Sequence, residues 1–100
     1  MKNNAWRKAH DLMVTTLQED LSKLAVLTPA EDRHVIADLV HRIAGSLRIA
    51  RRNELADACL SLEKQCRDTS LPVEVFTPAL MSLTTELYAY LSDLQNSPVL

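Results

Sequence analysis

The sequence predicts an all-α fold, an up-down-up-down antiparallel four-helix bundle, and three observations support this prediction. Apolar residues recur three or four positions apart in separate segments, which is the period of one face of a helix. The 100 residues include a single glycine, and no Asn-Gly or Asp-Gly pair that would close a β-hairpin. The connections between the helical segments are short, which favours antiparallel neighbours. A chain of this length can bury one modest core, so residues 1–100 are interpreted as one domain.

The first two helices are separated by the clearest boundary signal in the sequence. A first helix is expected over about residues 4–26. Thr28 can then cap a second helix, Pro29 suits the first helical position, and Glu31 completes a capping box. The second helix is therefore expected from Pro29 to about Ile49. Its predicted apolar stripe consists of Ile36, Leu39, Val40, Ile43, Leu47 and Ala50.

A third helix is expected from Glu54 to about Arg67, with Asn53 as its N-cap after a tight turn. Cys59 and Cys66 lie on it seven positions apart. Their Cα atoms would be separated by about 10 Å along a helix, too far for a disulfide. Both are therefore predicted to be reduced.

The last helix has two possible starts. Thr77-Pro78 repeats the cap-plus-proline signal, which places the helix from about Pro78 to Leu94. The alternative is a helix that begins near Pro72 and bends at Pro78. Residues 96–100 are expected to fray.

Composition narrows the class of protein. No apolar run is long enough to span a membrane, and the N-terminus lacks the apolar core of a signal peptide. A cytoplasmic location is therefore expected, although a parent protein could be membrane-bound. The net charge is −2, but residues 41–52 carry four arginines and no acidic residue. A local basic patch suits a small anion or an acidic protein surface better than nucleic acid.

The candidate functional residue is His41, near the middle of the second helix. The only glycine, Gly45, follows four positions later, although glycine in a helix costs about 1 kcal/mol relative to alanine. Both residues fall at roughly 140–180° from Ile43 around the helix, so both are predicted to be exposed. A glycine there would let a large partner approach the histidine.

The residues around His41 favour a nucleophilic imidazole that carries a phosphoryl group. Asp38, one turn earlier, can orient the ring, and Arg42 and Arg48 supply positive charge nearby. Two other interpretations fit the same residues. His41 could be a simple solvated residue, or His34, Asp38 and His41 could bind zinc. The last is disfavoured because the two histidines would be about 10 Å apart along the axis, so no metal site is predicted.

These residues carry a family resemblance. The stretch His41-Arg42-Ile43-Ala44-Gly45-Ser46, followed by Leu55, Cys59 and Leu62-Glu63, resembles the signature of the histidine phosphotransfer (HPt) domain of bacterial phosphorelays. That signature is His-x-(Leu/Ile)-Lys-Gly-(Ser/Ala), then a leucine, a cysteine and Leu-Glu on the next helix. The stretches 19–24 and 38–41 are also similar to the HPt modules at the C-termini of hybrid sensor kinases, so the resemblance covers roughly residues 17–67.

The resemblance implies a function and a set of roles. His41 would accept a phosphoryl group from a receiver-domain aspartate of a response regulator and pass it to a second receiver. Gly45, with Ala44 beside it, would form the receiver-docking surface. Glu63 would orient the histidine, and Arg67 would lie near the phosphate. The domain would be a monomer with no ATP-dependent kinase activity, no cofactor and no contact with nucleic acid or membrane; Mg²⁺ would sit in the receiver.

Two positions depart from the family pattern. Ala44 stands where the family has a phosphate-facing lysine, and Arg48 could replace that charge from the same face. Arg51 stands where the family often has a glycine in the turn, so either the turn differs or a non-glycine residue adopts a left-handed conformation. The missing lysine leaves open a degenerate HPt-like module that docks a receiver without phosphotransfer. A plain helical interaction domain is a third possibility.

Overall fold

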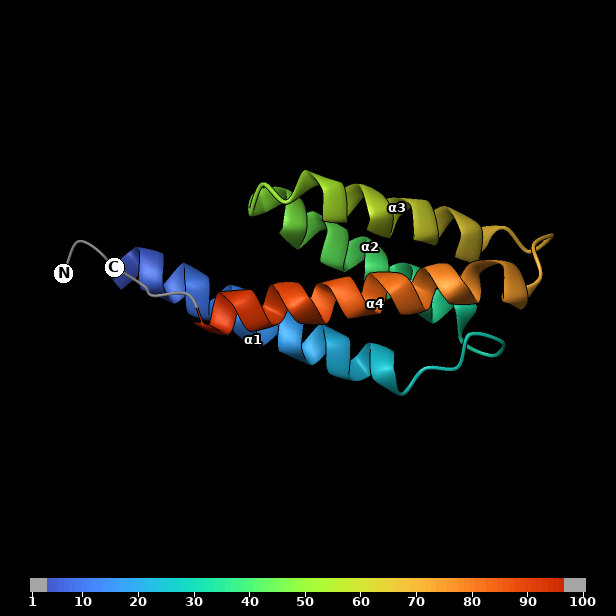
Figure 1. Cartoon of the computed structure of the whole chain (residues 1–100), viewed down its shortest axis with the longest axis horizontal. Coiled ribbons are helices and arrows are strands. Elements are labelled where there is room, and N and C mark those ends of the chain that lie inside the picture. Colours follow the sequence, from blue (N-terminus) through green and yellow to red (C-terminus); the bar gives the residue numbers. More distant parts are fainter. Residues whose placement is uncertain (1–3, 97–100) are drawn as a thin grey trace.

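The computed structural model describes residues 4–96, which form a bundle of four helices joined by short loops (Figure 1). The helices are α1 (Asn4–Ala25), α2 (Arg33–Ile49), α3 (Asn53–Arg67) and α4 (Val73–Asn96). Successive helices run antiparallel (Figure 1). Both α1 and α3 pack against α2 and α4, so α2 lies diagonally opposite α4. The predicted all-α up-down four-helix bundle is confirmed. Within residues 4–96, no helix has both the length and the apolar character needed to cross a membrane.

The core is formed by the inward stripes of all four helices. On α2, the buried residues include Ile36, Leu39, Val40, Ile43 and Leu47, as the periodicity predicts, whereas Ala50 just after the helix is partly exposed. Both cysteines are buried free thiols. Burial raises the pKa of Cys59 to about 12, so this side chain stays protonated and behaves as a small apolar residue.

The bundle is elongated, 52 × 22 × 18 Å, and α1 is displaced along its long axis relative to α2 and α3 (Figure 1). The first turns of α1 and the last turns of α4 extend beyond the α2–α3 turn (Figure 1). Trp6, which shares the apolar periodicity of α1, is consequently 62% exposed, and Leu17 is the first buried residue within residues 5–25. The middle of α2, the part of the helix that carries His41, lies where all four helices are present (Figure 1).

Helix α2 begins at Arg33, later than the capping signal at Thr28-Pro29 predicts. The carboxylate of Asp32 accepts a hydrogen bond from the backbone N–H of Thr28 at 2.8 Å, and the N–H of Asp32 donates to the Thr28 carbonyl at 2.8 Å. These two bonds close a separate turn. The predicted capping box is therefore wrong, because Asp32 and not Glu31 is the acidic partner of Thr28.

The α2–α3 turn confirms the strained alternative at Arg51, whose φ is 61°. The N–H of Arg52 donates to the carbonyl of Leu47 at 2.8 Å, and the N–H of Arg51 donates to that of Arg48 at 3.0 Å. This is the Schellman pattern that usually ends in glycine. An arginine at this position costs on the order of 1–2 kcal/mol in backbone strain. Asn53 is the first residue of α3 and not its cap.

Helix α4 begins at Val73 and continues through Pro78, so the earlier of its two predicted starts is correct. Pro78 cannot donate a hydrogen bond to the carbonyl of Glu74, one turn earlier. Both residues are exposed, so the helix loses this bond on its solvent side. Leu80, Leu83 and Leu87 then continue the buried stripe. Of the segment expected to fray, Asn96 ends α4 and residues 97–100 lie outside the described residues.

Candidate functional site

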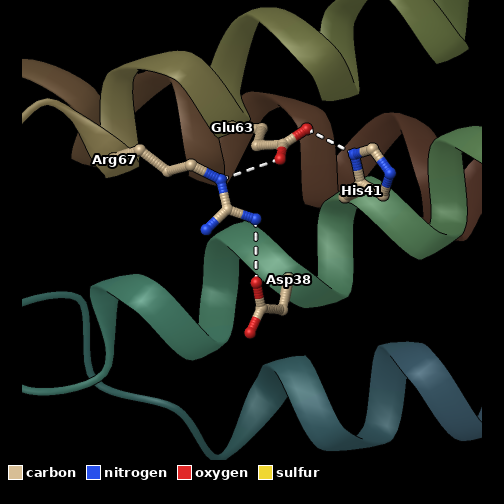
Figure 2. A network of polar contacts seen from close by, with 4 residues as sticks. All are labelled: Asp38, His41, Glu63 and Arg67. Atoms are coloured by element: carbon tan, nitrogen blue, oxygen red, sulfur yellow. Dashed lines mark hydrogen bonds and ion pairs between the residues drawn. The ribbon is translucent and has the colours of Figure 1, made fainter.

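His41 projects from the middle of α2 with its side chain 65% exposed. Its Nδ1 atom lies 2.7 Å from Oε1 of Glu63 on α3, and Figure 2 shows this contact on one edge of the ring. The second ring nitrogen points away from Glu63 (Figure 2). One nitrogen is therefore bound by the protein, and the other is directed outward.

The ionisation of Glu63 determines which ring nitrogen carries the proton. Partial burial favours a raised pKa for this carboxyl, but hydrogen bonds from His41 and Arg67 outweigh it, and the pKa lies below its ordinary value. Glu63 is thus a carboxylate near neutral pH and can only accept hydrogen bonds. In the neutral imidazole, Nδ1 must then be the donor, which leaves a lone pair on Nε2.

Arg67 supports Glu63 from the last turn of α3. Its Nε atom donates to Oε2 of Glu63 at 2.8 Å, and its Nη2 atom donates to Oδ1 of Asp38 at 2.8 Å (Figure 2). The hydrogen bonds to Asp38 and Glu63 raise the pKa of Arg67 above its ordinary value. His41, Glu63, Arg67 and Asp38 therefore form a hydrogen-bonded chain that crosses from α2 to α3 and back, with Arg67 between two carboxylates.

These hydrogen bonds correct the role predicted for Asp38 and show the partners of Arg67. Asp38 was predicted to orient the imidazole, but it binds Arg67, and Glu63 makes the orienting contact. The place of Arg67 near a phosphate stays a prediction; in the structure Arg67 lies on the Nδ1 side of His41 and reaches the ring through Glu63 (Figure 2). The role that the resemblance implies for Glu63 agrees with the geometry.

The two arginines predicted to supply positive charge are bound to carboxylates of other helices. Arg42 pairs with Asp20 of α1, whose side chain is 3% exposed. Arg48 pairs with Asp57 of α3 at 3.0 Å. Two of the four arginines in the basic stretch of the sequence are therefore paired with carboxylates. Asp20 and Asp57 were not assigned these roles from the sequence. One signal in the sequence indicates that Asp20 has a buried partner: it is a carboxylate within the apolar stripe formed by Leu17, Leu21 and Leu24.

Gly45 and Ala44 differ in exposure although they are adjacent. Gly45 is exposed, and a Cβ atom built on it would meet nothing within 4 Å. Its missing side chain therefore leaves open space on the His41 face. Ala44 is 1% exposed and belongs to the core. The prediction that Ala44 contributes to a docking surface is wrong, because its side chain faces inward.

The zinc interpretation gains no support from the geometry. Asp38 is bound to Arg67, and within residues 4–96 no three His, Cys, Asp or Glu side chains are placed to hold a metal ion together. His10 is also occupied, since its Nε2 atom lies 3.0 Å from the carbonyl oxygen of Leu94. The exposed histidines with free access from solvent are His34 and His41.

Comparison with known proteins agrees with this arrangement. The family model of the Hpt domain matches residues 8–97, nearly the whole chain. Nothing matched among curated proteins or among solved structures. Hpt domains are histidine-containing modules of phosphorelays in two-component signalling, and they interact with the receiver domains of response regulators. The exposed histidine on a four-helix bundle and the match over nearly all of the sequence lead to one conclusion: this chain belongs to the Hpt domain family.

Proposed function

We propose that His41 accepts a phosphoryl group on Nε2 from the aspartyl phosphate of one receiver domain and passes it to the aspartate of a second receiver. The observation that carries this proposal is the contact between Nδ1 of His41 and Glu63, because it leaves the other nitrogen exposed as the nucleophile. A nucleophile needs access to its substrate and a group that orients it, and His41 has both.

The transfer can be written with its charges balanced. The lone pair of Nε2 forms a bond to phosphorus, while the bond from phosphorus to the aspartate oxygen breaks and leaves its electron pair on the carboxylate. The imidazole keeps its proton on Nδ1 and becomes positively charged as the new bond forms. Glu63 faces that proton at 2.7 Å, so its negative charge stabilises the product ring. The second transfer reverses these steps.

In this proposal, the positive charge that stabilises the phosphoryl group comes mainly from the receiver. Ala44 cannot supply it, and Arg42, Arg48 and Arg67 each bind a carboxylate. The receiver holds its own Mg²⁺ during transfer in this proposal. The Hpt domain acts as a monomer without a cofactor or kinase activity of its own, in the cytoplasm or as part of a membrane-bound sensor kinase.

The test is to mix the domain with a receiver labelled with ³²P on its aspartate and to follow the label. We expect acid-labile label on the domain and none on His41→Gln. The matched control is His34→Gln, which removes an exposed histidine from the same helix and should keep full labelling. Label that survives in His41→Gln and disappears in His34→Gln would contradict the assignment.

A docking module without phosphotransfer is the second candidate function. The alanine at position 44 favours it, since this chain lacks the cation that the family pattern places there. In the same experiment, this function would give stable binding of the receiver with no label on the domain. Such a result would leave the Gly45 surface as the functional feature and remove the chemical role of His41.

A further inference from the structure

We propose that Arg33 is a positioning residue for His41: it fixes the last turn of α3, and through that turn it places Glu63 and Arg67 against the imidazole. The inference rests on the proposed function only for its consequence on phosphorylation. Arg33 does not touch His41, and it was not singled out in the sequence, because a single arginine after a loop resembles any solvated residue.

The guanidinium of Arg33 donates hydrogen bonds to backbone carbonyls at the end of α3 and in the loop that follows. Its Nε atom donates to the carbonyl of Cys66 at 2.9 Å. Its Nη2 atom donates to the carbonyls of Asp68 at 2.9 Å and Leu71 at 3.0 Å, and more weakly to that of Gln65 at 3.4 Å. Arg33 thus connects the first residue of α2 with the last turn of α3.

The aromatic ring of Phe76 holds the guanidinium in place. The Cζ atom of Arg33 lies 4.9 Å from the centroid of this ring, which is completely buried in the first turns of α4. A cation over an aromatic face is attracted to it, and the planar guanidinium can stack there while its edge donates hydrogen bonds. One side chain therefore links three helices at one end of the bundle.

The end of α3 needs such a partner. The last four backbone carbonyls of a helix accept no hydrogen bond from an N–H group of the same helix. A helix end whose carbonyls have no other partner frays. A positive charge at this end also interacts favourably with the helix dipole. Arg33 supplies both effects at Cys66, which directly precedes Arg67, and adds a weak bond at Gln65, whose carbonyl also accepts from the N–H of Asp68 at 3.3 Å.

Fraying at this end would directly disturb the hydrogen bonds between Arg67, Glu63 and His41. Arg67 is the last residue of α3, and Glu63 lies one turn before it. If the last turn opened, Arg67 would lose the geometry that binds Oε2 of Glu63, and the carboxylate would be free to leave Nδ1 of His41. Arg33 and His41 are eight residues apart on α2, about 12 Å along the axis. Because both belong to the same helix, the distance between them is fixed.

The structure offers a matched control at the opposite end of α3. Arg52 also stacks on an aromatic ring, with its Cζ atom 4.9 Å from the centroid of Tyr90. It precedes the first turn of α3 and not the last. Arg52→Gln therefore removes an equivalent cation–π contact far from Glu63. Arg33→Gln and Arg33→Lys are the test variants, and lysine keeps the charge but loses the planar fork.

The first measurement is the tautomer of His41, read from the ¹⁵N chemical shifts of its ring nitrogens in the folded protein at neutral pH. We expect wild type and Arg52→Gln to hold the proton on Nδ1, and Arg33→Gln to show a mixture of Nδ1–H and Nε2–H forms. Amide hydrogen exchange at residues 64–67 should rise by about tenfold or more in Arg33→Gln, since bonds to a charged donor are lost. Arg33→Lys should be intermediate in both measurements.

The second measurement is phosphorylation of His41 by phosphoramidate, followed by ³¹P NMR, which needs no receiver. We expect the rate at Nε2 to fall by about three- to tenfold in Arg33→Gln, because an oriented ring reacts faster than a mobile one. Faster exchange at residues 64–67 with an unchanged tautomer would overturn the inference and leave Arg33 as a purely structural contact. Unchanged exchange would also overturn it.

These readouts separate the inference from the proposed function. If phosphoramidate leaves no phosphoryl group on wild-type His41, the proposed function loses its support, while the tautomer still decides the role of Arg33. If Arg33→Gln fails to fold, Arg33→Lys provides the comparison with wild type. An Arg33→Lys protein with the wild-type tautomer and wild-type exchange would then contradict the inference.

Discussion

The two edges of the His41 imidazole are built in opposite ways. On the Nδ1 edge, Glu63, Arg67 and Asp38 follow one another through hydrogen bonds of 2.7–2.8 Å. One turn further along α2, the exposed Gly45 presents a backbone on which even a Cβ atom would meet nothing within 4 Å. We call the Nδ1 side with Glu63, Arg67 and Asp38 the closed edge, because the protein itself completes it. We call the exposed surface at Gly45 the open edge.

This difference indicates a division of labour between the domain and its partner. The Hpt domain fixes the ring orientation and the proton position before any encounter, so the partner does not have to organise them. Under the proposed function, the groups that contact the phosphoryl oxygens would come from the receiver. Variants on the two edges should therefore affect different measurements, and each prediction below tests that separation.

The largest effect is expected on the closed edge, from Glu63→Ala. Loss of a charge-assisted hydrogen bond is typically worth about 1.5–3 kcal/mol, so phosphorylation of His41 should slow by roughly 10–100-fold. The measurement is the rate of phosphorylation by phosphoramidate, with ³¹P NMR to identify the nitrogen. The product should also shift from pure Nε2 toward a mixture with Nδ1.

The control for this prediction is Glu63→Gln. The amide oxygen of glutamine can still accept the proton of Nδ1, so the Nε2 product should remain, at a rate between those of wild type and Glu63→Ala. Equal rates in all three proteins would mean that the closed edge does not contribute to reactivity. The separation between the two edges would then have no chemical basis.

The next largest effect is expected on the open edge, from Gly45→Leu. The added side chain enters open space, so folding should be preserved, while the affinity for a receiver should fall by about tenfold, or 1.4 kcal/mol. The measurements are the unfolding midpoint in urea and the Kd of a receiver by titration calorimetry. Phosphorylation by phosphoramidate should be unchanged, because that donor is small.

Ser82→Leu is the matched control for Gly45→Leu. Ser82 is exposed on α4, the helix diagonally opposite α2, so the same bulk there should leave receiver binding intact. If both variants weaken binding equally, the effect is one of general surface apolarity. If Gly45→Leu unfolds the protein, the open edge is in fact a packing contact.

Much of the bundle was predictable because it depends on local patterns. The three-to-four-residue period located the core of α2, and the same period put His41 and Gly45 on the exposed face. The start of α2 was mispredicted because two acidic residues, Glu31 and Asp32, follow Thr28. Which carboxylate reaches the Thr28 backbone depends on the path of the loop, and this path is not encoded in any periodicity.

The polar contacts of the site were less predictable because they cross between helices. Sequence spacing places Asp38 one turn from His41, yet Asp38 binds Arg67. The choice depends on how α3 packs against α2, which spacing within one helix cannot report. Ala44 illustrates the same limit from the other direction, since a position aligned with a phosphate-facing lysine is buried here.

The smallest predicted effect is an acid-induced weakening of the closed edge. The folded-state pKa of Glu63 lies below its ordinary value of 4.5, so below that value the unfolded state binds more protons than the folded state. Glu63 therefore contributes stability that is fully present above pH 4.5 and is lost as the pH falls through its lower folded-state pKa.

Glu63→Gln lacks this titration. Urea unfolding at a series of pH values should show that wild type loses more stability than Glu63→Gln between pH 6 and pH 3, whereas His34→Gln should follow wild type. Parallel curves for wild type and Glu63→Gln would show that the carboxylate gains nothing from His41 and Arg67, and the closed edge would then be no more organised than the open one.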